Sequence, residues 1–439
     1  MIDRSAAWLA ETAGARLVAG DPDEPGPRRA VVHSREAGEG DLFVGLRGQH
    51  VDGGEFAAGA LANGAWGALV GEPHAAVESE RPLLVTDHPL RALQRLARGW
   101  RRELGCRVVG ITGSTGKTST KDILAALLRR TLRTHANREN LNTEIGLPLS
   151  VLEAQPDAEA LVLEMAMRGV GQIAELAAVA EPDVGVIVNV GPVHLELLGT
   201  VERVAAAKAE LIRDLPAGAA CVVPASEPLL EAHLREDIDT WTFGPGGQVM
   251  LLSFEDGRVE IEARGERHSL ELPYSEPHNL LNTLAAVAAA RAVGVRPHGP
   301  VEVRFSSMRG QVVELPGGVA VVNDCYNANP MSMRAALEHL AESPAERRIA
   351  VLGTMAELGA EAPRYHREIG RVAAEVGVDV LVTVGEQALG YADGFDGETH
   401  AVASPEEAGL LLEELALPGD RVLVKGSRSV GLERVLALG

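Results

Sequence analysis

Residues 107–118 read Arg107-Val-Val-Gly-Ile-Thr-Gly-Ser-Thr-Gly-Lys-Thr118, and this stretch decides the fold of the central part of the chain. A short apolar run leads into a glycine-rich loop, and a long helical pattern follows as far as Arg130. Glycines let backbone N–H groups turn toward phosphate oxygens, and the start of a helix adds partial positive charge. In such a loop Lys117 can reach the β and γ phosphates of a nucleotide, and the Thr118 hydroxyl can ligate Mg²⁺. The residues predicted to bind the nucleotide here are Gly113, Ser114, Thr115, Gly116, Lys117, Thr118 and Ser119.

The glycine spacing of this loop departs from the general phosphate-loop pattern. That pattern places a glycine six residues before the lysine, where this chain has Ile111. The glycines stand instead at positions 110, 113 and 116. The alternative interpretation is a glycine-rich turn with a chance lysine. Because a strand, a loop, a Lys-Thr pair and a helix coincide here, the sequence favours nucleotide binding.

The composition limits the classes of protein to which the chain can belong. At 439 residues, of which 46% are hydrophobic, it is expected to form two or three domains with a core in each. A net charge of −21 argues against a nucleic-acid-binding surface, which needs clustered lysine and arginine. Three widely spaced cysteines, Cys106, Cys221 and Cys325, exclude a disulfide framework and a four-cysteine zinc site. Since neither a signal peptide nor an apolar run of membrane-spanning length is evident, the expected location is the cytoplasm.

The order of apolar runs and helical patterns predicts three domains, all of the α/β class. Residues 1–86 mix short apolar runs with many glycines, which is typical of a small α/β domain. Residues 87–311 alternate strands with helices, which predicts a mostly parallel sheet, and a hairpin pattern around Asp256-Gly257 predicts a small antiparallel side sheet. Residues 312–439 repeat the strand–helix alternation, as in a Rossmann-like domain. The strand candidates are 107–111, 160–165, 184–190, 319–323, 348–352, 379–384 and 421–424.

Polar residues follow two strands that should neighbour the phosphate loop. Glu164 ends one of them, and Asn189 and His194 come after the next. Ligands bind outside the carboxyl ends of the strands in open α/β sheets, and phosphoryl transfer needs hard cations with oxygen ligands. Glu164 suits that task, and His194 suits a second metal or a general polar contact. A single glutamate or histidine after a strand more often has a structural role, but the shared position of Glu164 and His194 favours a functional one.

Lys208 is a candidate of a different kind. It lies in Ala205-Ala-Ala-Lys-Ala, within a helix that is predicted to be capped at Thr200. Small neighbours would let its ammonium group approach other groups closely. A helical lysine by itself, however, is typical of a solvated surface. The residues alone therefore leave the role of Lys208 open.

Together and in this order, the motifs resemble those of the Mur ligase family. The glycine pattern with Lys117-Thr118 is similar to the nucleotide loop of that family, and several later motifs match in sequence order. They are Asn142 before Ile145-Gly-Leu-Pro148, Glu164, Asn189, His194, Lys208, His278-Asn-Leu-Leu-Asn282 and Met308-Arg-Gly310. The resemblance covers nearly the whole chain. It implies a UDP-substrate domain (1–86), a central ATP-binding domain with a phosphate loop (87–311) and a C-terminal Rossmann-like domain (312–439).

The resemblance also implies roles for individual residues. In this family the lysine that corresponds to Lys208 is carbamoylated, which turns a cation into an anionic oxygen ligand. Thr118 and Glu164 would then hold one Mg²⁺, and Glu164, His194 and carbamoylated Lys208 would hold a second. The catalytic residues that the resemblance implies are Lys117, His194, Lys208 and Arg309. The residues near the adenine, the γ-phosphate and the ribose would be Asn279, Asn282, Arg309 and Asp324.

Further segments resemble the family members that add a dipeptide. The segment Asp324-Cys-Tyr-Asn-Ala-Asn-Pro330 is similar to theirs, as are Gly353–Gly359 with His366 and, near the end, Lys425–Ser429. In the first domain, Ser34-Arg35 and Asp41-Leu-Phe-Val44 resemble the segment that receives the UDP-sugar, although His33 stands where an aspartate is usual. The substrate-binding residues that follow from these likenesses are Ser34, Arg35, Phe43, Asn142, Thr143, Tyr326, Asn327, Asn329, Lys425, Ser427 and Arg428.

The function implied is ATP-dependent ligation of D-alanyl-D-alanine to a UDP-linked muramoyl tripeptide through an acyl phosphate, a step of peptidoglycan synthesis. The expected ligands are ATP, two Mg²⁺ ions and small-molecule substrates, without a nucleic-acid partner, and the expected assembly is a monomer. One alternative is another ligase of this family that adds a single amino acid. A second alternative is a phosphate-loop ATPase that couples hydrolysis to partner binding. The segment from Tyr326 to Pro330 argues against the first alternative.

Overall fold

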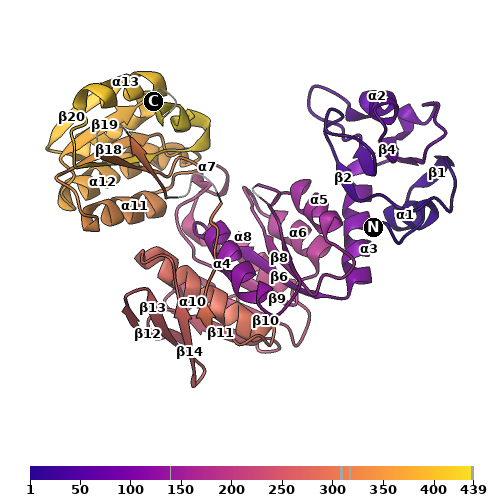
Figure 1. The fold of residues 1–439 in the computed structure, drawn as a ribbon, viewed down its shortest axis with the longest axis horizontal. Helices are drawn as coiled ribbons and strands as arrows, with labels where there is room; N and C mark the ends of the chain where they lie inside the picture. The colour runs from indigo at the N-terminus through magenta and orange to yellow at the C-terminus, as the bar shows by residue number, and fades with distance from the viewer. Residues whose placement is uncertain (139, 307–309, 316–317, 437–439) are drawn as a thin grey trace.

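The computed structural model describes residues 1–439 apart from 139, 307–309, 316–317 and 437–439. Its strands form three sheets that follow one another along the chain, so the three expected α/β domains are present. The N-terminal and C-terminal domains lie at opposite ends of the molecule, with the central domain between and below them (Figure 1). The domain boundaries at residues 86 and 311 stay a prediction. Strand β16 (Gln311–Leu315) begins at the second of them, with the last residue that was assigned to the central domain.

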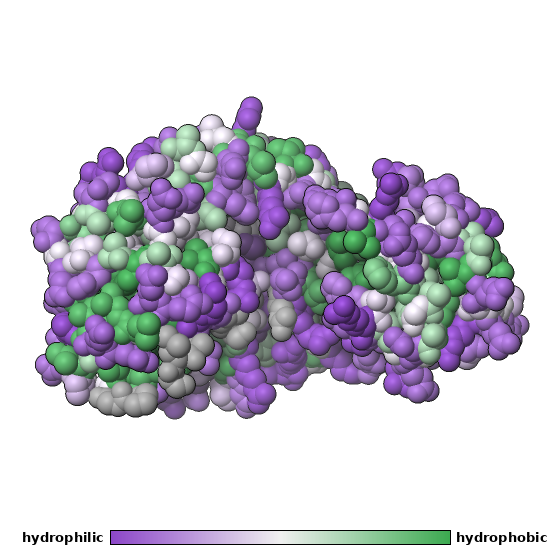
Figure 2. Space-filling view, turned by 90° about the horizontal axis from the view of Figure 1, so that it is seen from above, coloured by the Kyte–Doolittle hydropathy of each residue, from purple (hydrophilic) through white to green (hydrophobic). Residues whose placement is uncertain are grey.

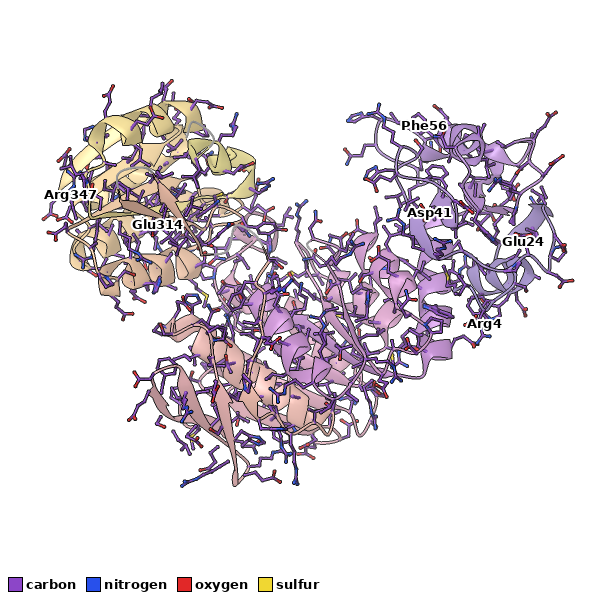
Figure 3. All side chains as sticks on the ribbon, viewed as in Figure 1. Arg4, Glu24, Asp41, Phe56, Glu314 and Arg347 are labelled. Carbon is purple, nitrogen blue, oxygen red and sulfur yellow. The ribbon has the colours of Figure 1, made fainter. Side chains whose placement is uncertain are left out.

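The N-terminal domain is built on a five-stranded sheet in the order β1-β5-β4-β3-β2. Its elements are α1 (Ala6–Ala13), β1 (Arg16–Ala19), β2 (Arg29–Val31), β3 (Asp41–Val44), η1 (Gly53–Phe56), α2 (Ala57–Ala62), β4 (Gly67–Gly71), η2 (Glu72–His74) and β5 (Leu83–Thr86). β1 is antiparallel to β5, and the other neighbours are parallel. Because successive strand residues face opposite sides, Leu42 and Val44 of β3 join the core around α1, whereas Phe43 joins the core around α2. Figure 3 labels Asp41, whose carboxylate lies 2.9 Å from the Arg29 guanidinium and so ties β3 to β2.

Helix α3 (Pro89–Leu104) joins the first domain to the second. Its buried residues, Ala92, Leu93, Leu96, Ala97 and Trp100, recur at helical spacing and form one apolar face. That face contacts α1 of the N-terminal domain and two helices of the central domain. The Trp100 indole N–H donates to the carbonyl of Ala154, 3.1 Å away. The two domains therefore share one continuous hydrophobic core at this helix.

The central domain has a ten-stranded sheet in the order β15-β14-β13-β12-β11-β10-β9-β6-β8-β7. Its first elements are β6 (Arg107–Thr112), α4 (Lys117–Arg129), β7 (Thr134–Ala136), α5 (Gly146–Glu153), β8 (Ala160–Glu164), α6 (Gln172–Ala180), β9 (Val184–Ile187), α7 (Leu195–Leu198) and α8 (Val201–Arg213). Its later elements are β10 (Ala220–Pro224), α9 (Pro228–Glu231), β11 (Asp239–Phe243), β12 (Val249–Glu255), β13 (Arg258–Ala263), β14 (Glu266–Glu271), α10 (Pro277–Ala292) and β15 (Gly299–Pro300). The strands from β7 to β11 are parallel, as predicted.

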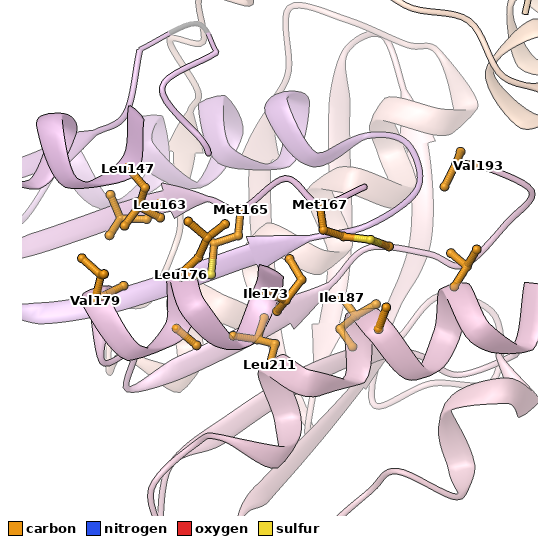
Figure 4. Close-up of a cluster of buried hydrophobic side chains, with 14 of the residues drawn as sticks. Leu147, Leu163, Met165, Met167, Ile173, Leu176, Val179, Ile187, Val193 and Leu211 are labelled. Atoms are coloured by element: carbon orange, nitrogen blue, oxygen red, sulfur yellow. The ribbon is translucent and has the colours of Figure 1, made fainter. Parts of the chain in front are cut away.

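Helices cover both faces of this parallel sheet. Leu161 and Leu163 of β8 pack with α5, α6 and α8 on one face, whereas Val162 packs with α4 and α10 on the other. Figure 4 shows part of the first core, where Leu147, Leu163, Leu176 and Leu211 come from four different elements. Strands that are buried on both faces read as continuous apolar runs. This explains why β6, β8 and β9 could be located from the sequence.

The predicted hairpin forms, but it extends the main sheet. Asp256 and Gly257 both have positive φ, at 48° and 78°, as a two-residue hairpin turn requires, and Glu255 pairs with Arg258 across it. The antiparallel strands β12, β13 and β14 join the parallel strands through the pairing of Phe243 with Val249. The expected side sheet is therefore continuous with the central sheet.

The C-terminal domain has a six-stranded sheet in the order β16-β17-β21-β18-β19-β20, parallel except for β16. Its remaining elements are β17 (Val319–Asn323), α11 (Pro330–Glu342), β18 (Arg347–Gly353), η3 (Gly359–Glu361), α12 (Ala362–Glu375), β19 (Val380–Val384), η4 (Glu386–Gly394), β20 (Glu398–Val402), α13 (Pro405–Leu415), β21 (Asp420–Lys425), η5 (Arg428–Val430) and η6 (Leu432–Leu436). On the outer side of this domain, Arg347 (Figure 3) forms an ion pair of 2.7 Å with buried Asp420. Among the described residues, no helix has the length and apolar character needed to cross a membrane.

A glycine in α12 allows the helix to pack against the backbone of η4. A Cβ atom at Gly370 would lie 1.9 Å from the carbonyl oxygen of Tyr391. We therefore expect Gly370→Ala to destabilise the C-terminal domain by about 1–3 kcal/mol, because a rigid backbone must move. At a helix position with free space around it, the same change would raise the free energy of unfolding by about 0.5–1 kcal/mol. The sign of the change in the free energy of unfolding is measured by urea unfolding, with hydrogen exchange of the α12 amides as the probe. Exposed Arg371→Ala is the control. A raised midpoint for Gly370→Ala would contradict this packing.

Candidate active site

A cleft of about 1200 Å³ lies between the central and C-terminal domains. The carboxyl ends of β8, β9, β17 and β21, the loop before α4 and the start of α10 line it. Seen from above, the molecule is hollowed between its terminal domains, and hydrophilic residues line much of the hollow (Figure 2). The predicted site residues that line the cleft are Ser114, Thr115, Gly116, Lys117, Thr118, Ser119, Asn142, Thr143, Glu164, His194, Asn279, Asn282, Asp324, Tyr326, Asn327, Asn329, Lys425, Ser427 and Arg428.

The phosphate loop is shaped by contacts with the segment after β9. The Asn189 carboxamide oxygen accepts from the backbone N–H groups of Ser114 and Thr115, at 3.0 and 2.9 Å. The Ser114 hydroxyl also exchanges hydrogen bonds with Gly191. Gly116, at the start of α4, has a φ of 75°, and a Cβ there would lie 2.5 Å from the Asn282 side chain. Asn189 therefore fixes the shape of the loop, and the loop leads into the N-terminus of α4, a position that favours a bound anion.

Glu164 is a buried carboxylate that touches this loop. Its Oε2 accepts a 2.6 Å hydrogen bond from the Thr118 hydroxyl, and its Oε1 accepts a 2.8 Å bond from Asn142 Nδ2. The side chain is nearly inaccessible, and no lysine or arginine pairs with it in the described part of the chain. A buried carboxylate of this kind is costly without a counter-charge. Its oxygen-rich surroundings fit a hard divalent cation.

The backbone of Glu164 is held by a residue that the sequence did not single out. The Asn137 carboxamide accepts from the Glu164 N–H at 2.8 Å and donates to the carbonyls of Glu164 and Leu141, at 3.1 and 2.8 Å. The carbonyl of Asn137 accepts from the ammonium group of Lys121, 2.9 Å away on α4. Lys121 lies four residues after Lys117, on the same helix face. The four-residue spacing between Lys117 and Lys121 was the signal in the sequence that could have pointed to this network.

Lys208 lies on α8 and does not line the cleft. Thr200 caps the helix as predicted, because its side chain accepts from the N–H of Arg203. The side chain of Lys208 is buried, and within the described part of the chain it has no hydrogen bond or ion pair. Burial, with the nearby charge of Lys117, lowers the pKa of Lys208 well below its ordinary value. The group is therefore disposed to be a neutral amine, which is a nucleophile.

The chain contains four lysines among its 41 lysines and arginines. They are Lys117, Lys121, Lys208 and Lys425. All four lie at the cleft or directly behind it. Every other basic side chain in the sequence, apart from histidine, is an arginine.

His194 faces the C-terminal domain. It has a φ of 53° at the start of α7, and its Nδ1 forms a hydrogen bond with Oε2 of Glu357. This bond is the main cause that lowers the pKa of Glu357. No group of three or more histidine, cysteine, aspartate or glutamate side chains suited to a metal ion occurs in the part of the chain that the structure describes. The predicted metal ligands are not a group of this kind, because Glu164 and His194 are combined with the Thr118 hydroxyl and with Lys208.

The remaining predicted nucleotide residues are placed as follows. Asn279 and Asn282, on α10, are buried and joined by a hydrogen bond of 3.3 Å. Asp324 follows β17 and accepts a 2.5 Å bond from the Lys425 ammonium group. Lys425 is itself buried and donates also to the carbonyl of Asn327. Arg309 lies outside the described residues.

Some predicted substrate residues have structural contacts or lie away from the cleft. Asn329 caps α11, because its side chain accepts from the Ser332 N–H at 3.0 Å. Phe43 is fully buried in the core of the N-terminal domain, so its side chain presents no surface there. Ser34 is partly exposed and Arg35 is exposed, in the loop that follows β2. Their contacts with substrate stay a prediction.

Known proteins resemble this chain over nearly its whole length. Residues 111–290 match the Mur ligase middle domain, and residues 308–428 match the Mur ligase, glutamate ligase domain. The UDP-N-acetylmuramoyl-tripeptide–D-alanyl-D-alanine ligase of Synechocystis sp. is 35% identical over 422 residues, which cover 92% of this chain and 90% of the relative. The structure of MurF from Acinetobacter baumannii superposes with a TM-score of 0.87 at 28% identity and covers 99% of this chain and 98% of its own. MurF ligase from Thermotoga maritima in complex with ADP gives a TM-score of 0.81 at 34% identity, with coverage of 94% and 96%.

The Asn137 network makes a direct stability prediction. Asn137→Ala leaves the buried N–H and carbonyl of Glu164 without partners, so we expect a loss of about 1–3 kcal/mol in the free energy of unfolding. Asn140→Ala, in the same loop but exposed, is the matched control and should change it by less than about 0.5 kcal/mol. Urea unfolding measures both. Equal midpoints for the two variants would show that the network does not support Glu164.

Proposed function

The chain belongs to the Mur ligase family, and we propose that it joins D-alanyl-D-alanine to UDP-N-acetylmuramoyl-tripeptide with conversion of ATP to ADP and phosphate. The observation that carries the proposal is the full-length similarity to ligases of that name. The geometry supports it, because the phosphate loop and Glu164 face Asp324 and Lys425 of the C-terminal domain across one cleft. ATP, the UDP-linked tripeptide and the dipeptide must meet at one place, and a cleft between two domains can hold all three.

Formation of an amide from a free carboxylate needs activation, since its oxygen is a poor leaving group. We expect a carboxylate oxygen of the tripeptide to attack the γ-phosphorus of ATP while the bond to the bridging oxygen breaks and ADP leaves. The amine of the dipeptide then attacks the acyl carbon, and phosphate leaves from the tetrahedral intermediate as the amine loses a proton. Lys117 and the N–H groups of the phosphate loop offset the phosphoryl charge in the first step. Closure of the cleft excludes water, which would otherwise hydrolyse the acyl phosphate.

The residues present fit a bound Mg²⁺. Buried Glu164 lacks a cationic partner among the described residues and is bonded to the Thr118 hydroxyl. We assign Thr118 and Glu164 to one ion, and Glu164, His194 and Lys208 to a second. When bound, the ions would neutralise charge on the phosphate oxygens. His194 and Glu164 reach the cleft directly.

Lys208 needs modification to serve as an oxygen ligand. Its burial and its lowered pKa favour the neutral amine, whose lone pair can form an N–C bond to carbon dioxide with release of a proton. The resulting carbamate carries a negative charge. That charge would compensate Lys117 nearby, and it would make Lys208 a ligand of the type that Mg²⁺ prefers. A monomer is the expected assembly.

The proposed reaction is tested by phosphate release with Mg-ATP, UDP-N-acetylmuramoyl-tripeptide and D-alanyl-D-alanine, with each omitted in turn. We expect release to need all three and to yield a pentapeptide product of the corresponding mass. Release without the dipeptide would point to a plain ATPase. Release with a single amino acid in place of the dipeptide would point to a different ligase of the family.

The carbamate is tested by replacement of Lys208. We expect Lys208→Ala to lose nearly all activity, with partial rescue by short carboxylic acids, because an added carboxylate can take the place of the carbamate. A carbamate carbon signal should appear by nuclear magnetic resonance of the unaltered protein in ¹³C-bicarbonate and be absent from Lys208→Ala. Full activity of Lys208→Ala would exclude the proposed role.

A further inference from the structure

We infer that Glu357 of the C-terminal domain is a positioning residue for His194, and that it makes the second metal site depend on docking of the two domains. The inference rests on the proposed function, in which His194 binds a metal ion. It concerns a residue that the proposed reaction does not otherwise use. Glu357 belongs to the loop between β18 and η3, and His194 lies between β9 and α7.

The hydrogen bond between these residues leaves one imidazole nitrogen for a metal ion. Nδ1 of His194 bonds to Oε2 of Glu357, whereas Nε2 has no hydrogen-bond partner in the part of the chain that the structure describes. A metal-binding histidine usually donates its other N–H to a carboxylate, which fixes the tautomer and the ring orientation and raises the basicity of the ligating nitrogen. Glu357 and His194 have this carboxylate–histidine arrangement.

The central domain holds Glu357 through both its side chain and its backbone. Its Oε1 lies 3.5 Å from Arg168 Nε, and its backbone carbonyl accepts from the N–H of Glu196 at 3.2 Å. A Cβ at Gly359 would lie 3.0 Å from the Cα of Glu196, so the two backbones approach closely here. The contact is therefore anchored by the main chain as well as by the side chains.

The backbone at both residues is in the left-handed region. His194 has a φ of 53° and Glu357 a φ of 62°. The other described non-glycine residues with positive φ lie at a helix end (Glu181) or in hairpin turns (Asp256 and Arg264), where the local turn requires it. His194 also lies at a helix end, the start of α7, whereas Glu357 lies in the loop between β18 and η3, outside any hairpin. Strain of this kind persists where the surrounding structure fixes it, often at functional sites.

The pair links two distant parts of the chain. The two residues are separated by 163 positions and lie in loops of two domains with different sheets, so their bond exists only while the domains are docked. Metal affinity at His194 should then be higher in the docked arrangement. By linkage, a bound ion should favour docking to the same extent. Glu357 thus connects assembly of the cleft with assembly of the metal site.

The test is a titration of the protein with Mn²⁺ in the presence of a non-hydrolysable ATP analogue, followed by electron paramagnetic resonance. We expect Glu357→Ala to weaken the second Mn²⁺ site by about 10- to 100-fold and to leave the first within about twofold. Glu357→Gln keeps an oxygen that can accept the imidazole N–H, so it should recover part of the affinity. Glu361→Ala is the matched control, since this exposed carboxylate pairs with Arg364 and does not line the cleft.

Two results with the Glu357 variants and the unaltered protein would overturn the inference. One is that Glu357→Ala, or Glu357→Gln if the alanine variant does not fold, binds both ions with unaltered affinity. The other is that the unaltered protein binds a single Mn²⁺, so that there is no second site to position. Neither result decides whether the chain is a ligase, because the substrate-omission assay measures that separately. Loss of the second site in Glu361→Ala as well would also contradict a specific role for Glu357.

Discussion

The buried carboxylate of Glu164 has no cationic partner in the described part of the chain, and the central domain is arranged around this constraint. A charge in that position costs several kcal/mol unless hydrogen bonds and a counter-charge compensate it. Thr118 and Asn142 bond to its two oxygens, Asn137 holds its backbone, and Lys121 holds Asn137. These contacts fix the phosphate loop and its helix relative to β8. The side chain that needs a cation therefore also determines where a nucleotide phosphate would lie.

The distribution of basic residues follows the chemistry that each position needs. Arginines form the surface ion pairs, such as that of Arg16 with Glu72. The four lysines are confined to the cleft and its supports. A guanidinium is planar and keeps its charge, whereas an ammonium group is compact and can lose its proton when it is buried, as the lowered pKa of Lys208 indicates. Within a chain that has a net charge of −21, Lys117 and Lys425 thus stand on opposite walls of the cleft.

The cleft combines the carboxyl edges of two parallel sheets. Loops at such edges can carry polar side chains without disturbing the strands, which stay buried on both faces. The central sheet presents the phosphate loop and Glu164, and the C-terminal sheet presents Asp324 and Lys425. Glu357 bonds across the boundary to His194. Because each half of the site belongs to a rigid sheet, movement between domains can change the site as a unit.

The sequence by itself determined the elements whose signals are local. The loop before α4, the hairpin at Asp256-Gly257, the Thr200 cap and the strands β6, β8, β9, β17, β18, β19 and β21 follow from glycine positions, capping residues and apolar runs. Edge strands β16 and β20 escaped prediction, because their side chains are largely exposed and make no apolar run. Tertiary structure alone decided that Phe43 belongs to a core, that Asn137 supports Glu164 and that Glu357 meets His194. Such contacts join residues far apart in the chain, and a local pattern carries no record of which distant groups packing will bring together.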